Sequence, residues 1–301
     1  MKILISYRGI PNSPGWETGS LLADAFIELG HEVSRYGHYY QKGWDYPIGD
    51  VTPINQSKEY DYIIYCECND PDPQYVELKY VKARKRVYWE FDTSYHPELS
   101  AAIVNYFKFD HIFYANSRYE TFFKPRWFYF SHAPSISWLP YGFCQRKHFT
   151  NFTNKKFLYT IIGSPWKERK EIYDALKDAG IEVEFITGKF REEYIKALAQ
   201  SQATINFNKN EGRGLLVMRV FEALGTKTCL ITNDGDDVQR VLKQGVECLV
   251  YKDTNDLIDI CKRYEKGQDL EWIANFGYER GMRDHTYEAR AQEIINILED
   301  L

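Results

Sequence analysis

Residues 212–232 read GRGLLVMRVFEALGTKTCLIT, and the fold class can be argued from them. Arg219 and Glu222 stand three positions apart in an apolar segment, and a second apolar run follows at 228–232. Side chains at this spacing share one face of a helix, so the pattern predicts a glycine-flanked loop, a helix and then a strand. This order is the repeating unit of a parallel α/β sheet.

The start of this helix also indicates a ligand. Glycines there leave backbone N–H groups free to meet an anion. A carboxylate a turn or two inside the helix suits the ribose hydroxyls of a nucleotide sugar, with its phosphates at the helix end. A core helix that carries a local ion pair is the alternative interpretation. The segment alone leaves both open.

Strands and helices alternate along the rest of the chain. A helix is expected over 21–29, with Ser20 as its N-cap and Gly30 at its end. Regular alternation predicts parallel sheets wound on both faces, with ligands at the carboxyl ends of the strands. The expected strands are 3–7, 62–66, 86–90, 111–115, 157–162, 183–187, 203–207, 228–231 and 247–250, and the later helices are 168–179, 192–200 and 215–224.

The chain has 301 residues, which is long for a single compact core. Residues 143–156 are polar and lack apolar periodicity, so they are interpreted as a linker. We therefore expect an α/β protein of two doubly wound, Rossmann-like domains, residues 1–150 and residues 151–301, the second ending in long amphipathic helices.

Composition excludes several classes of protein. A formal net charge of −5 argues against a general polyanion binder. The six cysteines are scattered in apolar runs, which is typical of reduced thiols. No second ligand pair follows Cys66 and Cys68 at zinc-site spacing. Asp70 and Asp72 form an Asp-x-Asp between prolines, a pattern that is common in loops by chance, so no metal is expected. The N-terminus is interpreted as a strand, and no run approaches the roughly 18 apolar residues of a membrane span. These features predict a cytoplasmic protein.

Four segments of the second half carry a family resemblance, with two weaker matches before them. In order they read RVFEALG at 219–225, LIT at 230–232, GVECLVYKD at 245–253 and HTYEAR at 285–290, and the weaker ones are WLPYG at 138–142 and IGS at 162–164. The chain resembles GT-B glycosyltransferases, more narrowly the spore-maturation-protein-like branch of the group 1 transferases.

The resemblance implies two Rossmann-like domains that face a cleft. It further implies that the N-terminal domain binds the acceptor and that the C-terminal domain binds a nucleotide sugar, such as a UDP-sugar. The implied reaction moves the sugar from a nucleoside diphosphate to an acceptor hydroxyl. The transfer would be retaining and independent of metal, and it would require no cofactor besides the nucleotide sugar.

The same resemblance assigns residues to the donor. It implies that Glu222 binds the ribose and that basic residues bind the diphosphate beside Gly163. The candidates for that role are Arg169, Lys170 and Arg219, although a solvated helix face is the alternative for the first two. Retaining group 1 enzymes often carry a second glutamate eight residues before the first. Here Gly214 stands at that place among the donor-binding residues, and Glu211 is the nearest substitute.

In the first half, candidate residues follow expected strands. Asp92 stands where related enzymes often place a histidine that faces the donor sugar, so it is a candidate general base, or else the N-cap of the next helix. His96 is a candidate for acid–base chemistry. Gly9, Gly15 and Trp16 belong to a glycine-containing loop that lets the backbone approach an acceptor or a sugar.

Two further functions remain open at this point. A sugar-nucleotide isomerase fits the same two-domain scaffold, and so does a non-catalytic protein that binds nucleotide sugars. The acceptor of a transferase is equally open. Protein, polysaccharide, a small molecule and a modified DNA base all fit the sequence.

Overall fold

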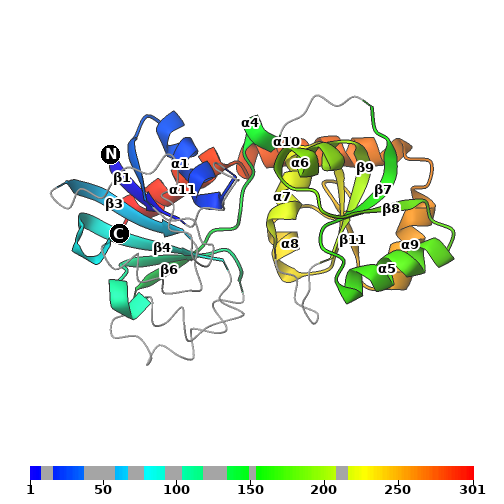
Figure 1. Cartoon of the computed structure of the whole chain (residues 1–301), viewed down its shortest axis with the longest axis horizontal. Helices are drawn as coiled ribbons and strands as arrows, with labels where there is room; N and C mark the ends of the chain where they lie inside the picture. Colours follow the sequence, from blue (N-terminus) through cyan, green and yellow to red (C-terminus); the bar gives the residue numbers. More distant parts are fainter. Residues whose placement is uncertain are drawn as a thin grey trace. The chain divides into compact units, whose positions relative to one another are not determined.

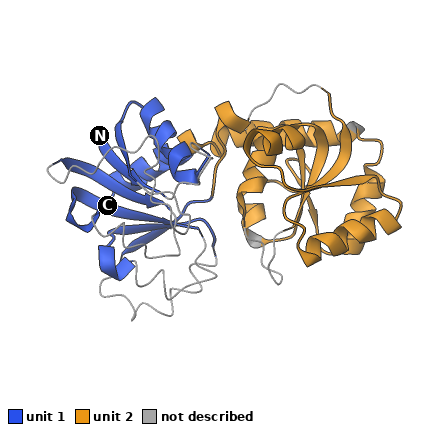
Figure 2. Ribbon diagram, in the orientation of Figure 1, with its two compact units in different colours: residues 1–140, 290–301 blue, residues 141–289 orange. Residues whose placement is uncertain are grey.

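The structure is a computed structural model, and it describes residues 1–7, 16–36, 58–66, 78–91, 104–117, 134–148, 154–207 and 216–301 (Figure 1). These residues form two compact units. Unit 1 comprises residues 1–140 and 290–301, and unit 2 comprises residues 141–289 (Figure 2).

The last helix differs from the expected division at residue 150. Helix α11 (Tyr287–Glu299) begins in unit 2, and its part after residue 289 belongs to unit 1. Its side chains Ala291, Ile294 and Leu298 are fully buried. The helix joins unit 1 because this apolar face is buried there, a partner that an amphipathic pattern does not identify.

Unit 1 is built on one parallel sheet. Its strand order is β2-β1-β3-β4-β5-β6, and every neighbouring pair is parallel. A cluster of buried aromatic side chains lies against the sheet, among them Tyr65, Tyr88 and Phe109. The elements are β1 (Lys2–Ser6), α1 (Thr18–Glu28), β2 (Glu32–Tyr36), β3 (Glu59–Cys66), β4 (Lys82–Glu90), β5 (His111–Tyr114) and β6 (Ser135–Trp138).

Helix α1 starts earlier than its sequence predicts. The expected N-cap Ser20 lies in the first turn, and Glu17 occupies the cap position without a side-chain capping bond. A Cβ on Gly19 would overlap with the Cβ of Tyr7, so the helix packs closely over the end of β1. This packing favours helix before Ser20. Gly30 follows the helix with φ +84°, as expected for a glycine at a helix end.

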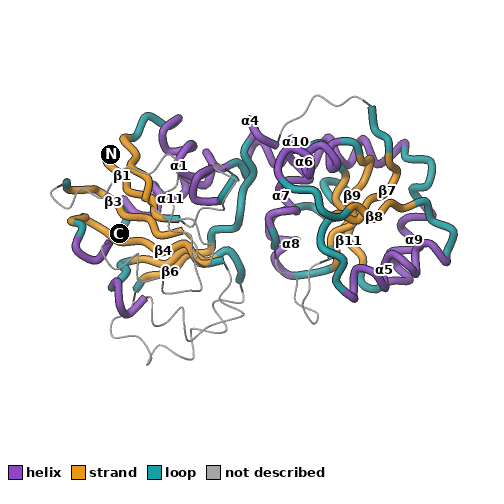
Figure 3. The backbone as a smooth tube through the Cα atoms, in the orientation of Figure 1, coloured by secondary structure: helices purple, strands orange, loops and turns teal. Residues whose placement is uncertain are grey.

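Unit 2 contains a second parallel sheet, of order β11-β10-β9-β7-β8. Helices lie on both sides of its strands (Figure 3). Contacts place α6, α7 and α10 together against β7, β9 and β10, while α5 and α9 pack on each other. The strands are β7 (Phe157–Ile162), β8 (Val183–Ile186), β9 (Ser201–Asn206), β10 (Cys229–Asn233) and β11 (Leu249–Tyr251). The helices are α4 (Gln145–His148), α5 (Lys167–Asp178), α6 (Arg191–Ala199), α7 (Met218–Gly225), α8 (Asp236–Val241), α9 (Thr254–Arg263) and α10 (Gln268–Asp284).

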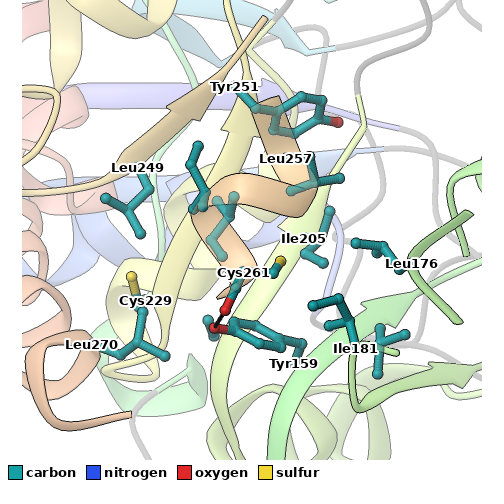
Figure 4. Close-up of a cluster of buried hydrophobic side chains, with 14 of the residues drawn as sticks. Tyr159, Leu176, Ile181, Ile205, Cys229, Leu249, Tyr251, Leu257, Cys261 and Leu270 are labelled. Carbon is teal, nitrogen blue, oxygen red and sulfur yellow. Dashed lines mark hydrogen bonds between the residues drawn. The ribbon is translucent and has the colours of Figure 1, made fainter. Parts of the chain in front are cut away.

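The core of unit 2 joins strands and helices that are distant in sequence. Figure 4 shows Tyr159 from β7 beside Cys229 from β10 and Cys261 from α9. The Tyr159 hydroxyl donates a hydrogen bond to the Cys261 carbonyl at 2.8 Å, so a buried polar group is satisfied. Burial raises the pKa of the Cys261 thiol to about 12. The expected doubly wound α/β class is confirmed by the two parallel sheets.

Candidate functional site

The order of strands in unit 2 indicates where a ligand binds. From β7 the chain passes through α5 to β8 on one side, and through α6 it then crosses to β9 on the other side. The carboxyl ends of β7 and β9 therefore flank the point where the strand order reverses. Open parallel sheets bind their ligands at this point, because the two loops diverge and leave a crevice.

Two arginines converge there over one glycine. Gly163 follows β7 with φ +136°, a backbone conformation that favours glycine. A Cβ on this residue would lie 2.8 Å from Nη1 of Arg169 and 3.0 Å from Nη2 of Arg219. Arg169 comes from α5 and Arg219 from α7, so helices that follow β7 and β9 both direct a guanidinium group to the same place.

Each guanidinium is held by neighbouring groups. Arg169 donates to the Ser164 carbonyl at 3.0 Å and lies over the Trp166 ring, 4.7 Å from its centroid. Arg219 donates to the side-chain oxygen of Asn206, the last residue of β9, at 3.0 Å. Hydrogen bonding and stacking leave several N–H donors of each group free to bind a ligand.

The electrostatics of the pair favour an anion. Burial, together with the neighbouring Arg219 charge, lowers the pKa of Arg169 to about 10, so both groups are positive at neutral pH. Among the described residues, no carboxylate forms an ion pair with either guanidinium. Nε of Arg219 is buried, and none of the described residues forms a hydrogen bond with it. Two like charges with unused donors form a site for a strongly charged anion.

Glu222 lies one turn further along α7. Its Oε2 accepts a hydrogen bond from the Tyr194 hydroxyl of α6 at 2.8 Å. Burial raises the pKa of Glu222, while the Tyr194 hydrogen bond and the Arg219 charge oppose the rise. A carboxylate has about four acceptor positions, so it retains capacity for the hydroxyl groups of a ligand. Arg219 and Glu222 therefore share a helix without forming the direct ion pair of the alternative interpretation.

The structure describes only some of the residues predicted from sequence. It brings Gly163, Arg169, Arg219 and Glu222 together in unit 2. Lys170 is exposed and does not join them. Trp16 lies in unit 1, partly buried, next to the start of α1. Five predicted residues lie outside the described residues, namely Gly9, Gly15, Asp92, His96 and Gly214.

Sequence reasoning missed two residues of this cluster. Asn206 could have been found, because a polar side chain that ends an apolar parallel strand lies at the ligand-binding edge. Its amide also donates to Oγ1 of Thr232 at 3.1 Å, which fixes the oxygen that Arg219 uses. No sequence pattern identifies Tyr194, because it stands 28 positions from Glu222 and on a different helix.

Two kinds of feature are absent from the described residues. No group of three or more His, Cys, Asp and Glu side chains in this part of the chain could hold a metal ion. Every helix in the described ranges is too short or too polar to cross a membrane.

Solved structures of similar fold are known over the whole chain. Anabaena HepE in complex with UDP and glucose matches with a TM-score of 0.68 and 15% identity, over 100% of both chains. An alpha-glucosyltransferase in complex with UDP-glucose and DNA containing an abasic site matches with a TM-score of 0.71 and 11% identity, over 99% of both. Sucrose-phosphate synthase from Thermosynechococcus elongatus matches with a TM-score of 0.63 and 12% identity, over 99% of this chain and 98% of that one. At these identities the likeness shows the shared fold, which is that of GT-B glycosyltransferases.

Sequence comparison is informative for the second half. No curated protein sequence matches the chain. The model of the glycosyl transferase-like family matches residues 146–296, a range that contains Gly163, Arg169, Arg219 and Glu222. The match spans half of the chain and includes the whole described arginine cluster. The protein therefore belongs to the glycosyl transferase-like family and is an enzyme that transfers sugars.

Proposed function

We propose that this enzyme uses a nucleoside diphosphate sugar as donor and transfers its sugar to an acceptor hydroxyl. The convergence of Arg169 and Arg219 over Gly163 is the observation that carries the proposal. Positive charges this close repel each other. A bound diphosphate offsets this repulsion, because its negative charge attracts both guanidinium groups. Guanidinium groups also match the oxygens of phosphate in bidentate geometry.

The rest of the cluster fits the nucleoside part of the same ligand. With the diphosphate at Gly163, the Glu222 carboxylate lies deeper along α7, where it can accept hydrogen bonds from ribose hydroxyls. Two of the solved structures named above contain UDP or UDP-glucose. A UDP-sugar is accordingly the first donor to test.

The chemistry follows from these positions. The bond between the anomeric carbon and the diphosphate oxygen breaks, a bond between that carbon and the acceptor oxygen forms, and the leaving diphosphate gains negative charge. Arg169 and Arg219 stabilise this charge, which is why we propose a transfer that needs no metal ion. We take the retaining outcome from the family resemblance. The acceptor hydroxyl loses its proton to a base, for which Asp92 and His96 remain the proposed residues.

The remaining assignments rest on sequence. We propose that unit 1 binds the acceptor and that Gly9, Gly15 and Trp16 contribute to that side of the reaction. Lys170 and Gly214 stay candidates for donor binding. The spore-maturation-protein-like branch is the proposed subgroup. Protein, polysaccharide, a small molecule and a modified DNA base are the proposed acceptor classes, and the solved alpha-glucosyltransferase complex with DNA supports including the last.

The test compares two basic residues of α5. Titration calorimetry with UDP, GDP, CDP and ADP is carried out on wild type, Arg169→Ala and Lys177→Ala. Loss of one charge-assisted contact to the diphosphate weakens binding, so Arg169→Ala is expected to raise Kd about 10-fold or more. Lys177→Ala, whose exposed side chain lies in the last turn of the helix, is expected to bind as wild type does. Unchanged affinity in Arg169→Ala, with its Tm preserved, contradicts the proposal.

A further inference from the structure

The hydroxyl of Tyr194 is the hydrogen-bond partner that the described residues provide for the Glu222 carboxylate. The two side chains come from different helices, α6 and α7, and their oxygens lie 2.8 Å apart. Both residues are partly buried. A polar contact between helices at this distance determines how the two side chains are oriented.

Tyr194 also lies among the charges of the site. Burial and the Glu222 charge raise the pKa of the Tyr194 hydroxyl, so it is a neutral donor at physiological pH. The Arg219 guanidinium interacts with the same hydroxyl, and the Arg169 charge lies close enough to interact with it. The tyrosine therefore contacts the carboxylate and also interacts electrostatically with both arginines.

A carboxylate binds a ligand hydroxyl at a defined position only if a hydrogen-bond donor fixes its own orientation. The terminal torsion of a glutamate side chain is broad, so the carboxylate rotates unless a hydrogen bond fixes it. Fixing it before the ligand arrives removes an ordering cost from binding. The Tyr194 bond occupies one acceptor position on Oε2 and leaves the others for the ligand.

We propose that Tyr194 is a positioning residue that holds the Glu222 carboxylate toward the ribose and thereby sets the preference for ribose hydroxyls in the donor. The inference rests on the proposed function, because it assumes that a nucleoside diphosphate binds beside Glu222. The inference adds Tyr194 to the site as a residue that acts through Glu222. Tyr194 affects selectivity for the sugar of the nucleoside, while the arginines bind the diphosphate.

The same contact acts on ionisation. Burial raises the pKa of Glu222, and the Tyr194 hydrogen bond is the first effect that opposes it, followed by the Arg219 charge. Removal of the hydroxyl therefore raises the pKa further. The protonated form accepts fewer hydrogen bonds, so the effect of the removal on ribose binding grows as pH falls.

The experiment uses Tyr194→Phe, which keeps the ring and removes the hydroxyl. Calorimetry measures the Kd of UDP, GDP, CDP and ADP and of their 2′,3′-dideoxy counterparts. In wild type the ribonucleotide is expected to bind more tightly. In Tyr194→Phe this preference is expected to fall about 10-fold, with dideoxynucleotide affinity unchanged. Tyr173→Phe is the matched control, because this tyrosine on α5 packs on Phe185 and its hydroxyl makes no hydrogen bond within the described residues.

A double-mutant cycle separates positioning from packing. In the Glu222→Gln background, Tyr194→Phe is expected to change the preference no further, because the carboxylate it positions is gone. Additive losses would show that the tyrosine acts through the packing of α6, and they would overturn the inference. An unchanged preference in Tyr194→Phe itself would overturn it equally.

The two proposals fail in distinguishable ways. If wild type binds none of the four ribonucleotides, or binds them independently of Arg169, the proposed function fails and the inference fails with it. If Glu222→Gln abolishes the preference for ribose but Tyr194→Phe retains it, the proposed function stands and only the role of Tyr194 is wrong.

Discussion

Glu222 is an ionisable group in a place where ionisation costs free energy. Its pKa is raised by burial, in spite of Tyr194 and Arg219. A raised pKa in the folded state means that this residue contributes stability below the pKa of the unfolded chain, and that this contribution is lost as pH rises through the folded pKa. In the ligand-free protein at neutral pH, the carboxylate therefore lowers stability, which is a frequent property of binding residues.

We expect Glu222→Gln to raise the Tm of the ligand-free protein at pH 8 by about 1 to 3 °C. The amide keeps the size of the side chain and removes the charge that burial penalises. The difference in Tm is expected to shrink as pH falls below the unfolded pKa of about 4.3, because the wild-type glutamate then becomes protonated in both states. Calorimetric scans at several pH values measure this dependence.

The control for this prediction is Glu184→Gln on β8, where the side chain is exposed. A shift in Tm of the same size and pH dependence in that variant would mean that general surface charge, and not the environment of Glu222, causes the effect.

At the scale of the elements, one aromatic ring packs between helices α7 and α10. Phe143 is fully buried, and it packs against a glycine on each helix. A Cβ on Gly225 would lie 2.6 Å from Cδ2 of the ring, and one on Gly281 would lie 3.0 Å from Cε1. Backbone bonds of Phe143 to His285 and Tyr287 hold the ring in this place. The expected linker therefore begins with a residue that is part of the core of unit 2.

Gly225→Ala is expected to lower the free energy of unfolding by about 1 to 3 kcal/mol, because the added methyl group overlaps with the Phe143 ring. Urea denaturation measures the change. In the Phe143→Leu background the same substitution is expected to cost less, since the smaller side chain leaves room. An equal cost in both backgrounds would contradict this contact as the cause.

The sequence predicts the elements best where strands are buried on both faces. Strand β7 has the predicted bounds, 157–162, because a central parallel strand is a continuous apolar run. Strand β6 (Ser135–Trp138) was not predicted, since an edge strand with two serines resembles a polar loop. Helix α8 (Asp236–Val241) is short and half charged, so its pattern is equally weak.

The same limit applies to the candidate site. Glu222 and the two arginines belong to motifs, and a spacing of three or four residues along one helix can be read directly. The bonds of Tyr194 and Asn206 depend on which helix lies beside which strand end. Such contacts follow from the strand order, which no local pattern in this chain specifies.

At the scale of the whole molecule, the two units have separate cores. The cysteines Cys229 and Cys261 lie in the core of unit 2, while Cys66 is buried in unit 1. Burial raises the pKa of the Cys229 and Cys261 thiols, so they react with thiol reagents only when unit 2 opens. Each thiol is thus a reporter of its own unit.

We expect a bound nucleoside diphosphate to protect one set of thiols only. In pulse labelling over a urea gradient, saturating nucleotide should raise the midpoint for Cys229 and Cys261, because a ligand of the folded state stabilises the unit that binds it. The midpoint for Cys66 should stay constant. Mass spectrometry of labelled peptides measures both, and an equal shift for Cys66 would show that the units unfold as one.

The position of helix α11 affects how the protein folds during its synthesis. The part of this helix after residue 289 belongs to unit 1, yet it leaves the ribosome after every residue of unit 2. Unit 1, whose synthesis begins first, therefore lacks part of its core until all of unit 2 has been synthesised. A nascent polypeptide that is halted before residue 290 therefore lacks the last segment of unit 1, and we expect chaperones to bind the apolar surface that this segment covers.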